Sequence, residues 1–112
     1  MAGIYYNALL RYNTQTASYT LALTDQQQDT VVEMNVATAN NLTIPLNSVV
    51  AFPIGSQILI AQYGAGQTTI VPTSGVTLRS SGGRTKIALQ YGLATLIKRG
   101  TDEWYLAGDI SV

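Results

Sequence analysis

The chain has 112 residues, enough for one domain that buries sufficient apolar surface to fold without disulfides. Only 11% of the residues are charged, and six basic residues balance six acidic ones, so the electrostatic signature of a binder of nucleic acid or of anionic membranes is missing. The chain has no Cys and no His, which excludes disulfides, thiol or imidazole catalysis and the usual zinc sites. Low charge also leaves little repulsion between copies, and this favours self-association.

Residues 1–17 are interpreted as a short N-terminal arm, and residues 18–112 as the folded domain. The apolar residues of the arm fit helical spacing but also an extended segment, and the arm could pack on its own domain or on a neighbour. Tyrosine provides large contact area at low entropic cost, so the arm is the candidate partner-binding segment. The candidate binding residues are Ile4, Tyr5, Tyr6, Leu9, Leu10 and Tyr12. Without a basic leader or a long apolar run, we expect neither a signal peptide nor a membrane span.

Alternation of apolar and polar residues predicts the first strands of the domain. Residues 18–24 and 30–35 each alternate with period two, and a short polar turn separates them. Two such runs joined by a short connection favour antiparallel pairing. Residues 42–44 form a further short strand, which Pro45 ends because proline cannot donate to a ladder.

Two apolar runs in the middle of the chain are interpreted as a β-hairpin, residues 57–63 and 68–71, joined by a tight turn at Gly64-Ala65-Gly66. The first run carries apolar residues on both faces, which predicts a central strand. Pro53 and Pro72 mark the ends of this unit.

The C-terminal third predicts a strand at 76–79, a tight turn at Gly82-Gly83 with positive φ angles, and a second hairpin from residues 93–99 and 103–109. Short strands at intervals of about eight to twelve residues are typical of all-β sandwiches and small barrels. The expected fold is therefore all-β, an antiparallel, jelly-roll-like β-sandwich with a short N-terminal arm.

No group of residues predicts a reaction site. Gly64-Ala65-Gly66 lacks a third glycine and the following helix of a dinucleotide-binding loop. The acidic residues lie mostly beside turns, where Asp caps its own backbone. We therefore expect no enzymatic activity, no cofactor and no metal. Trp104 and Tyr105 form a possible platform for stacking a sugar, although a Trp in a terminal hairpin is more often part of the core.

The order of several short motifs resembles a β-rich module of tailed-bacteriophage virion proteins, over residues 19 to 109. The motifs are Tyr19-Thr20-Leu21-Ala22-Leu23-Thr24-Asp25, Leu42-Thr43-Ile44-Pro45, Val50-Ala51-Phe52-Pro53-Ile54-Gly55-Ser56-Gln57-Ile58, Gly64-Ala65-Gly66-Gln67-Thr68-Thr69-Ile70, Gly75-Val76-Thr77-Leu78, Ala94-Thr95-Leu96-Ile97-Lys98 and Glu103-Trp104-Tyr105-Leu106-Ala107-Gly108-Asp109. Such modules often end tail-fibre-like or other virion-surface proteins, and related β-sandwich modules commonly form trimers.

The resemblance implies a structural protein of the virion surface, assembled in the cytoplasm of the bacterial host. Only residues 1–17 precede the module in this sequence, with no repetitive shaft, so the first expectation is a trimeric capsid decoration (cement) protein that binds the outside of the particle. The alternative is a tail-fibre or tail-spike-like module, with a receptor or glycan as its candidate ligand. The expected partners are other copies of the chain, in a homotrimer, and phage capsid or tail proteins, with neither nucleic acid nor membrane among them.

Overall fold

The computed structural model describes residues 9–27 and 29–112, which form short β-strands and two 3₁₀ helices. From β1 to β11 the strands are Arg11–Gln15, Tyr19–Thr20, Thr30–Met34, Asn40–Ile44, Gln57–Gln62, Thr68–Pro72, Thr77–Ser80, Lys86–Ile87, Leu93–Gly100, Glu103–Gly108 and Ile110–Ser111. The 3₁₀ helices η1 and η2 are Leu23–Gln26 and Ser81–Gly83.

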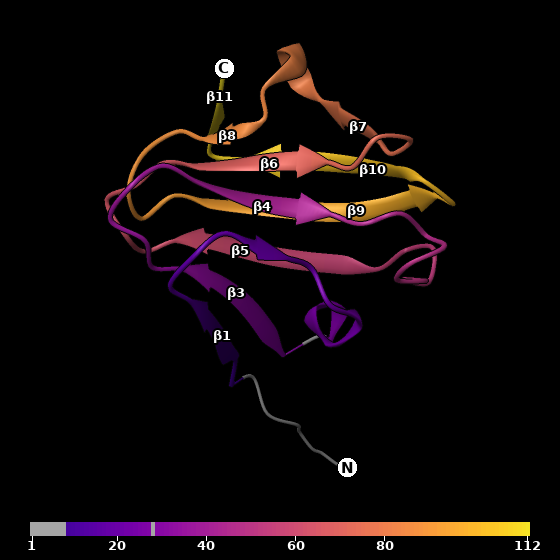
Figure 1. Cartoon of the computed structure of the whole chain (residues 1–112), viewed down its shortest axis with the longest axis horizontal. Coiled ribbons are helices and arrows are strands. Elements are labelled where there is room, and N and C mark those ends of the chain that lie inside the picture. Colours follow the sequence, from indigo (N-terminus) through magenta and orange to yellow (C-terminus); the bar gives the residue numbers. More distant parts are fainter. Residues whose placement is uncertain (1–8, 28) are drawn as a thin grey trace.

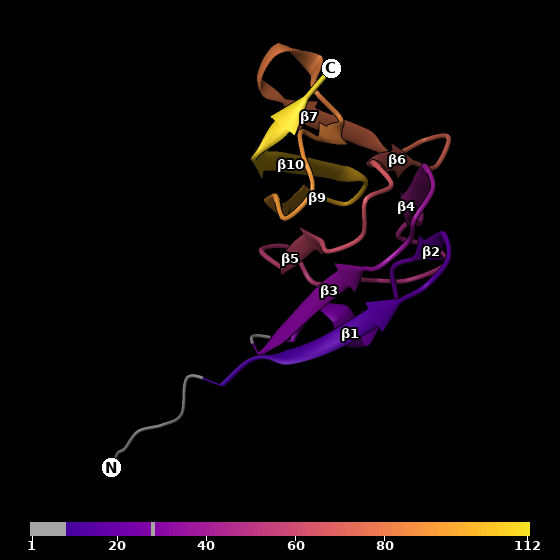
Figure 2. The same cartoon turned by 90° about the vertical axis from the view of Figure 1, so that its left-hand side faces the viewer.

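The strands form a six-stranded sheet, in the order β1-β3-β5-β9-β10-β7, and a five-stranded sheet, in the order β11-β8-β6-β4-β2. The chain alternates between the sheets, because β1, β3 and β5 lie in the first while β2, β4 and β6 lie in the second. Successive turns pair in parallel, β1 with β3 and β3 with β5 in the first sheet, and β2 with β4 and β4 with β6 in the second. The fold is therefore a small β-solenoid of about three turns, with β1 at one end and β11 at the other (Figures 1 and 2).

C-terminal strands pair with the last turn of the solenoid and run antiparallel to its strands. In the six-stranded sheet β9 runs antiparallel to β5 and β10 antiparallel to β9, while in the other sheet β8 runs antiparallel to β6. The predicted second hairpin is confirmed as β9 and β10. The predicted turn at Gly82-Gly83 is confirmed by a φ of 68° at both glycines, a conformation that L side chains rarely adopt.

The expected all-β class is correct, but the expected antiparallel β-sandwich is wrong, because most bridges between successive turns are parallel. The predicted central hairpin is also wrong: β5 and β6 lie in different sheets and do not pair. The predicted antiparallel pairing of 18–24 with 30–35 fails in the same way. The first of these runs contains β2, which pairs with β4, and residues 23–26, which form η1. The second contains β3, which pairs with β1 and β5.

The glycines of Gly64-Ala65-Gly66 mark a corner of the solenoid that stacks on the corner of the preceding turn. A Cβ atom at Gly64 would lie closer than 3.0 Å to the backbone of Val36, and one at Gly66 would lie closer than 3.0 Å to the backbone of Thr38. Neither glycine has a positive φ angle. These residues are glycine because two backbones approach closely, and not because a two-stranded hairpin turns there.

A buried polar cluster fixes the same corner. Asn40 donates from Nδ2 to the carbonyl oxygens of Thr38 (3.0 Å) and Gly66 (3.2 Å), one in each of two successive turns. The Thr68 hydroxyl donates to Asn40 Oδ1 at 2.7 Å, and Gln62 Oε1 accepts the backbone N–H of Thr68 at 3.0 Å. These bonds satisfy polar groups that burial would otherwise leave without partners.

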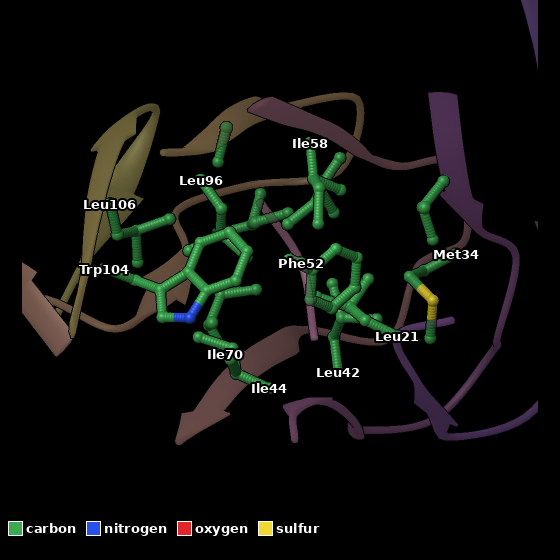
Figure 3. Close-up of a cluster of buried hydrophobic side chains, with 14 residues drawn as sticks. Leu21, Met34, Leu42, Ile44, Phe52, Ile58, Ile70, Leu96, Trp104 and Leu106 are labelled. Atoms are coloured by element: carbon green, nitrogen blue, oxygen red, sulfur yellow. The ribbon is translucent and has the colours of Figure 1, made fainter. Parts of the chain in front are cut away.

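The hydrophobic core lies between the two sheets and receives side chains from both (Figure 3). Its best-buried members include Val32, Leu42, Ile44, Ile58, Ile60, Leu96 and Trp104. The ring of Phe52, from the loop between β4 and β5, lies nearly perpendicular to that of Trp104, with the ring centroids 5.4 Å apart. This loop therefore helps to close the core beside the last turn.

The first turn is held by a buried carboxylate. Asp25 in η1 is only 1% exposed and accepts hydrogen bonds from Asn13 Nδ2 (2.7 Å), the Tyr19 hydroxyl (2.8 Å) and the Ala22 backbone N–H (2.8 Å). Burial raises the pKa of Tyr19 above 10.0, and the hydrogen bond to Asp25 raises it further. The phenol consequently stays protonated, and available as a donor, to higher pH than a free tyrosine does.

Replacing Tyr19 by Phe should lower the free energy of unfolding by about 2 kcal/mol, because the change removes one donor from a buried charged acceptor. Since folding raises the tyrosine pKa, the contribution of Tyr19 is complete below pH 10.0 and is lost as the pH rises through the folded-state pKa. Urea unfolding at pH 7 and above pH 10 measures both effects. The control is Tyr12→Phe, at a side chain that is 66% exposed, and an equal loss in both variants would contradict this role of Tyr19.

Candidate interaction surface

The six-stranded sheet turns one face away from the core, and this outer face carries mostly apolar side chains. Strand alternation places Ile58, Ile60, Leu96 and Trp104 inside, so the residues between them point outward. In register, Leu59 lies beside Thr95, Ala61 beside Leu93, Tyr105 beside Ile97 and Ala107 beside Thr95. The outer face is defined here by Leu59, Ala61, Leu93, Thr95, Ile97, Tyr105 and Ala107.

None of these seven residues is charged, and the larger ones are open to solvent. Leu93 is 51% exposed, Ile97 40% and Tyr105 46%. Single exposed apolar residues are ordinary on protein surfaces, whereas a contiguous apolar patch marks an interaction site more often. Because these residues are adjacent on neighbouring strands, the outer face is the main candidate surface.

Charged side chains border the outer face: Glu33 on β3 is in register with Ala61, and three more lie on β7, β9 and β10. Arg79 and Arg99 both contact the Glu103 carboxylate, at 2.8 Å and 3.0 Å. The hydrogen bond from Arg79, aided by the charges of both arginines, lowers the pKa of Glu103 against the opposing effect of desolvation. Exposed pairs of this kind contribute little to stability. They do provide charges at the rim of a neutral centre, which is the usual anatomy of a protein–protein interface.

A shallow groove of about 510 Å³ adjoins the outer face at the end of β5 and β9. Leu10 and Leu59 contribute to its wall together with neutral glutamines, and none of the described residues that line it is acidic or basic. Its polar groups include the hydroxyls of Thr30, Ser56 and Thr95. It can accept an uncharged side chain or segment of a partner.

The residues proposed for the N-terminal arm are only partly described. Ile4, Tyr5 and Tyr6 lie outside the described residues. Leu9 is 79% exposed, Leu10 46% and Tyr12 66%. Tyr12 lies on β1 in register with Val31, which is itself in register with Leu59, so it extends the outer face towards the edge of the sheet. Residues 11–15, within the proposed arm, thus form a strand of the sheet.

Trp104 and Tyr105, proposed as a sugar-stacking platform, point to opposite sides of β10. Trp104 is 1% exposed and packs in the core, whereas Tyr105 belongs to the outer face. The two rings therefore do not form one exposed platform. Another aromatic pair is exposed: Tyr63 and Tyr91 meet edge to face with their centroids 5.9 Å apart. Sequence reasoning missed this pair, because the two residues come from separate corners.

Over the described ranges, 9–27 and 29–112, no group of three His, Cys, Asp or Glu residues could hold a metal ion. Within the same ranges, no helix has the length and apolar character needed to cross a membrane. Comparison with known proteins finds no matching family model, no matching curated protein and no matching solved structure. The surface chemistry of the chain is therefore the basis for a functional proposal.

Proposed function

We propose that this chain is a structural subunit of a tailed-bacteriophage particle, which associates with copies of itself through the outer face of its six-stranded sheet. The observation that carries the proposal is the uncharged outer face, with Leu93, Ile97 and Tyr105 exposed on adjacent strands. The balance of six basic and six acidic residues is consistent with it, because copies of the chain repel each other little. The resemblance of residues 19–109 to phage virion modules supplies the biological setting.

The size of the outer face fits a modest interface for each subunit. Neighbouring strands lie about 4.8 Å apart and each residue advances about 3.3 Å, so β5, β9 and β10 together present on the order of 300 Å² in projection. Adding Tyr12 and the groove beside Leu59 extends this area towards the roughly 800 Å² per partner of a standard interface. Cyclic association would repeat the same contact in each subunit, and a homotrimer remains the proposed state.

Within the particle, the solenoid favours a tail-fibre-like role over the capsid decoration role. The expected decoration role rested on a short arm without a shaft, joined to a compact sandwich, and the sandwich is not present. Stacked parallel turns present a flat wall of strands along the solenoid axis, which suits lateral association about a common axis. Immunogold labelling of particles distinguishes the two locations, because label over the capsid would overturn the tail assignment.

Introducing charge into the outer face should abolish self-association. We expect Leu93→Lys combined with Ile97→Lys to yield a monomer, because an interface at this face would bury both new ammonium groups without partners. Sedimentation equilibrium measures the change, and circular dichroism checks the fold. The matched control is Val49→Lys, at a loop residue that is 72% exposed and should leave the oligomer intact. A wild-type protein that is monomeric at high concentration would contradict the proposal.

Binding to the particle by the N-terminal segment needs a separate test. Deletion of residues 1–8 leaves β1 in place, so it removes the segment without opening the sheet. Co-sedimentation of the shortened protein with purified particles would overturn residues 1–8 as the binding element, whereas the double lysine variant reports on the outer face. The two variants thus distinguish docking from self-association.

A further inference from the structure

Lys98 is buried inside the fold, although it is a charged residue in a chain with few charges. Its side chain lies on the inner side of β9 and is 2% exposed. The Nζ atom donates to the Phe52 carbonyl oxygen at 2.8 Å and lies 5.9 Å from the centre of the Trp104 ring. No carboxylate within the described residues forms a direct ion pair with it. Burial lowers the pKa of Lys98, and the charge of Asp102 opposes this shift to a smaller extent.

The other partner of the amine is a primary amide. Lys98 Nζ lies 2.6 Å from Asn47 Oδ1. The C=O bond is about 1.23 Å long, so Asn47 Cγ lies no more than about 3.8 Å from Nζ. This limit approaches the separation of about 3–3.5 Å at which reacting atoms are poised for attack. The hydrogen bond to Oδ1 therefore holds the buried amine within about 3.8 Å of the amide carbon.

A carboxyl group contacts the backbone of the same residue. Asp102 Oδ1 accepts the backbone N–H of Asn47 at 2.8 Å, and Asp102 is the ionisable neighbour whose charge acts on Lys98. The Trp104 ring lies beside the amine, with its centre 5.9 Å from Nζ, and Phe52 packs against that ring. An amine, an amide and a proton-transferring acid are the groups that amide exchange requires.

We propose that Lys98 and Asn47 form an intramolecular isopeptide bond, with Asp102 transferring the proton. No Asp102 oxygen lies within direct ion-pair distance of Lys98 Nζ, so the ammonium gives its proton to Asp102 through one intervening water. The neutral Nζ then attacks Asn47 Cγ. The new Nζ–Cγ bond forms, Asp102 passes its proton to Nδ2, and the Cγ–Nδ2 bond breaks. The second proton that Nζ loses on becoming an amide leaves with the departing ammonia as ammonium. The neutral chain therefore loses one ammonia, with no oxidation and no co-reactant. The bond joins β9 to the loop between β4 and β5.

The mass of the intact wild-type protein tests the bond directly. The bonded chain should weigh about 17 Da less than its sequence requires, the mass of one ammonia. Trypsin does not cleave after an acylated lysine, so digestion should release residues 87–99 joined to residues 12–79 as one branched peptide. An intact mass equal to the sequence mass would overturn the proposal and leave Lys98 as a structural cation. A loss of 17 Da without a branched peptide would also overturn the proposal, because a succinimide at Asn47 lowers the mass by the same amount and does not join the two peptides.

Two variants assign the roles. Lys98→Arg cannot be acylated by this route, and its mass should equal that of its own sequence. Asp102→Asn keeps an oxygen that can accept the Asn47 N–H but has no acidic proton, so it should fold, as circular dichroism will report, and lack the branched peptide. A branched peptide in folded Asp102→Asn would overturn the role of Asp102. The wild-type mass alone decides the bond, whether or not either variant folds.

Discussion

Gly66→Ala is expected to lower the free energy of unfolding by about 3 kcal/mol, at the upper end of the cost of overpacking. The added Cβ would lie closer than 3.0 Å to the Thr38 backbone, and a backbone cannot move aside as the end of a long side chain can. The corner is also tied by Asn40, which donates to Thr38 O and Gly66 O. Separating the two turns would therefore also break buried hydrogen bonds.

The matched control is Gly83→Ala. A Cβ at Gly83 meets nothing within 4 Å, but the residue has a φ of 68°, so the expected cost is only the roughly 1 kcal/mol of an alanine in the left-handed region. Chemical denaturation of both variants measures the comparison. A loss at Gly83 equal to or greater than that at Gly66 would show that backbone conformation, rather than the close stacking of turns, explains the glycines.

The sequence predicted the strands better than their partners. Alternation is a local property, and it correctly predicted strands at 30–35, 57–63, 93–99 and 103–109. Pairing depends on which strands are brought together, and two apolar runs joined by Gly64-Ala65-Gly66 fit both a hairpin and a solenoid corner. Only the close approach of Val36 and Thr38, from the preceding turn, distinguishes the two.

A repeat in the sequence could have indicated the solenoid, but it is short and irregular. Val31 pairs with Leu59 and Leu42 with Ile70, so partners in both sheets are 28 residues apart between the second and third turns. Between the first and second turns the spacing is 19 residues at Arg11, paired with Thr30, and 23 at Tyr19, paired with Leu42. The two sheets share one spacing, of 28 residues, only between the second and third turns. A single shared spacing is not a recognisable repeat, since solenoid signatures rest on several similar turns.

The candidate surface was only partly predictable for the same reason. Tyr12 was proposed as a binding residue from its aromatic character, and it lies at the edge of the outer face. Leu93 and Ile97 were assigned to a strand, but the side of the strand that meets the core depends on the position of the second sheet. Lys98 was interpreted as part of an alternating strand, and its contact with Asn47 joins residues 51 positions apart.

Trp104→Ala should cost about 4 kcal/mol of unfolding free energy, whereas Tyr105→Ala should cost less than about 1 kcal/mol. Trp104 is 1% exposed, packs against Phe52 and has Lys98 Nζ 5.9 Å from its ring centre. Its removal therefore leaves a cavity in the core. With typical domain stabilities of about 5–15 kcal/mol, the variant would retain a small margin or unfold. Thermal and urea unfolding measure the difference.

Tyr105 is the matched control because it is the next residue on β10 and points to the outer face, where it is 46% exposed. Its replacement should weaken self-association while leaving the unfolding free energy of the monomer nearly unchanged, and Trp104→Phe should recover part of the stability that Trp104→Ala loses. Equal destabilisation by Trp104→Ala and Tyr105→Ala would mean that both sides of β10 are covered within one subunit. In that case the outer face could not be the surface through which copies of the chain associate.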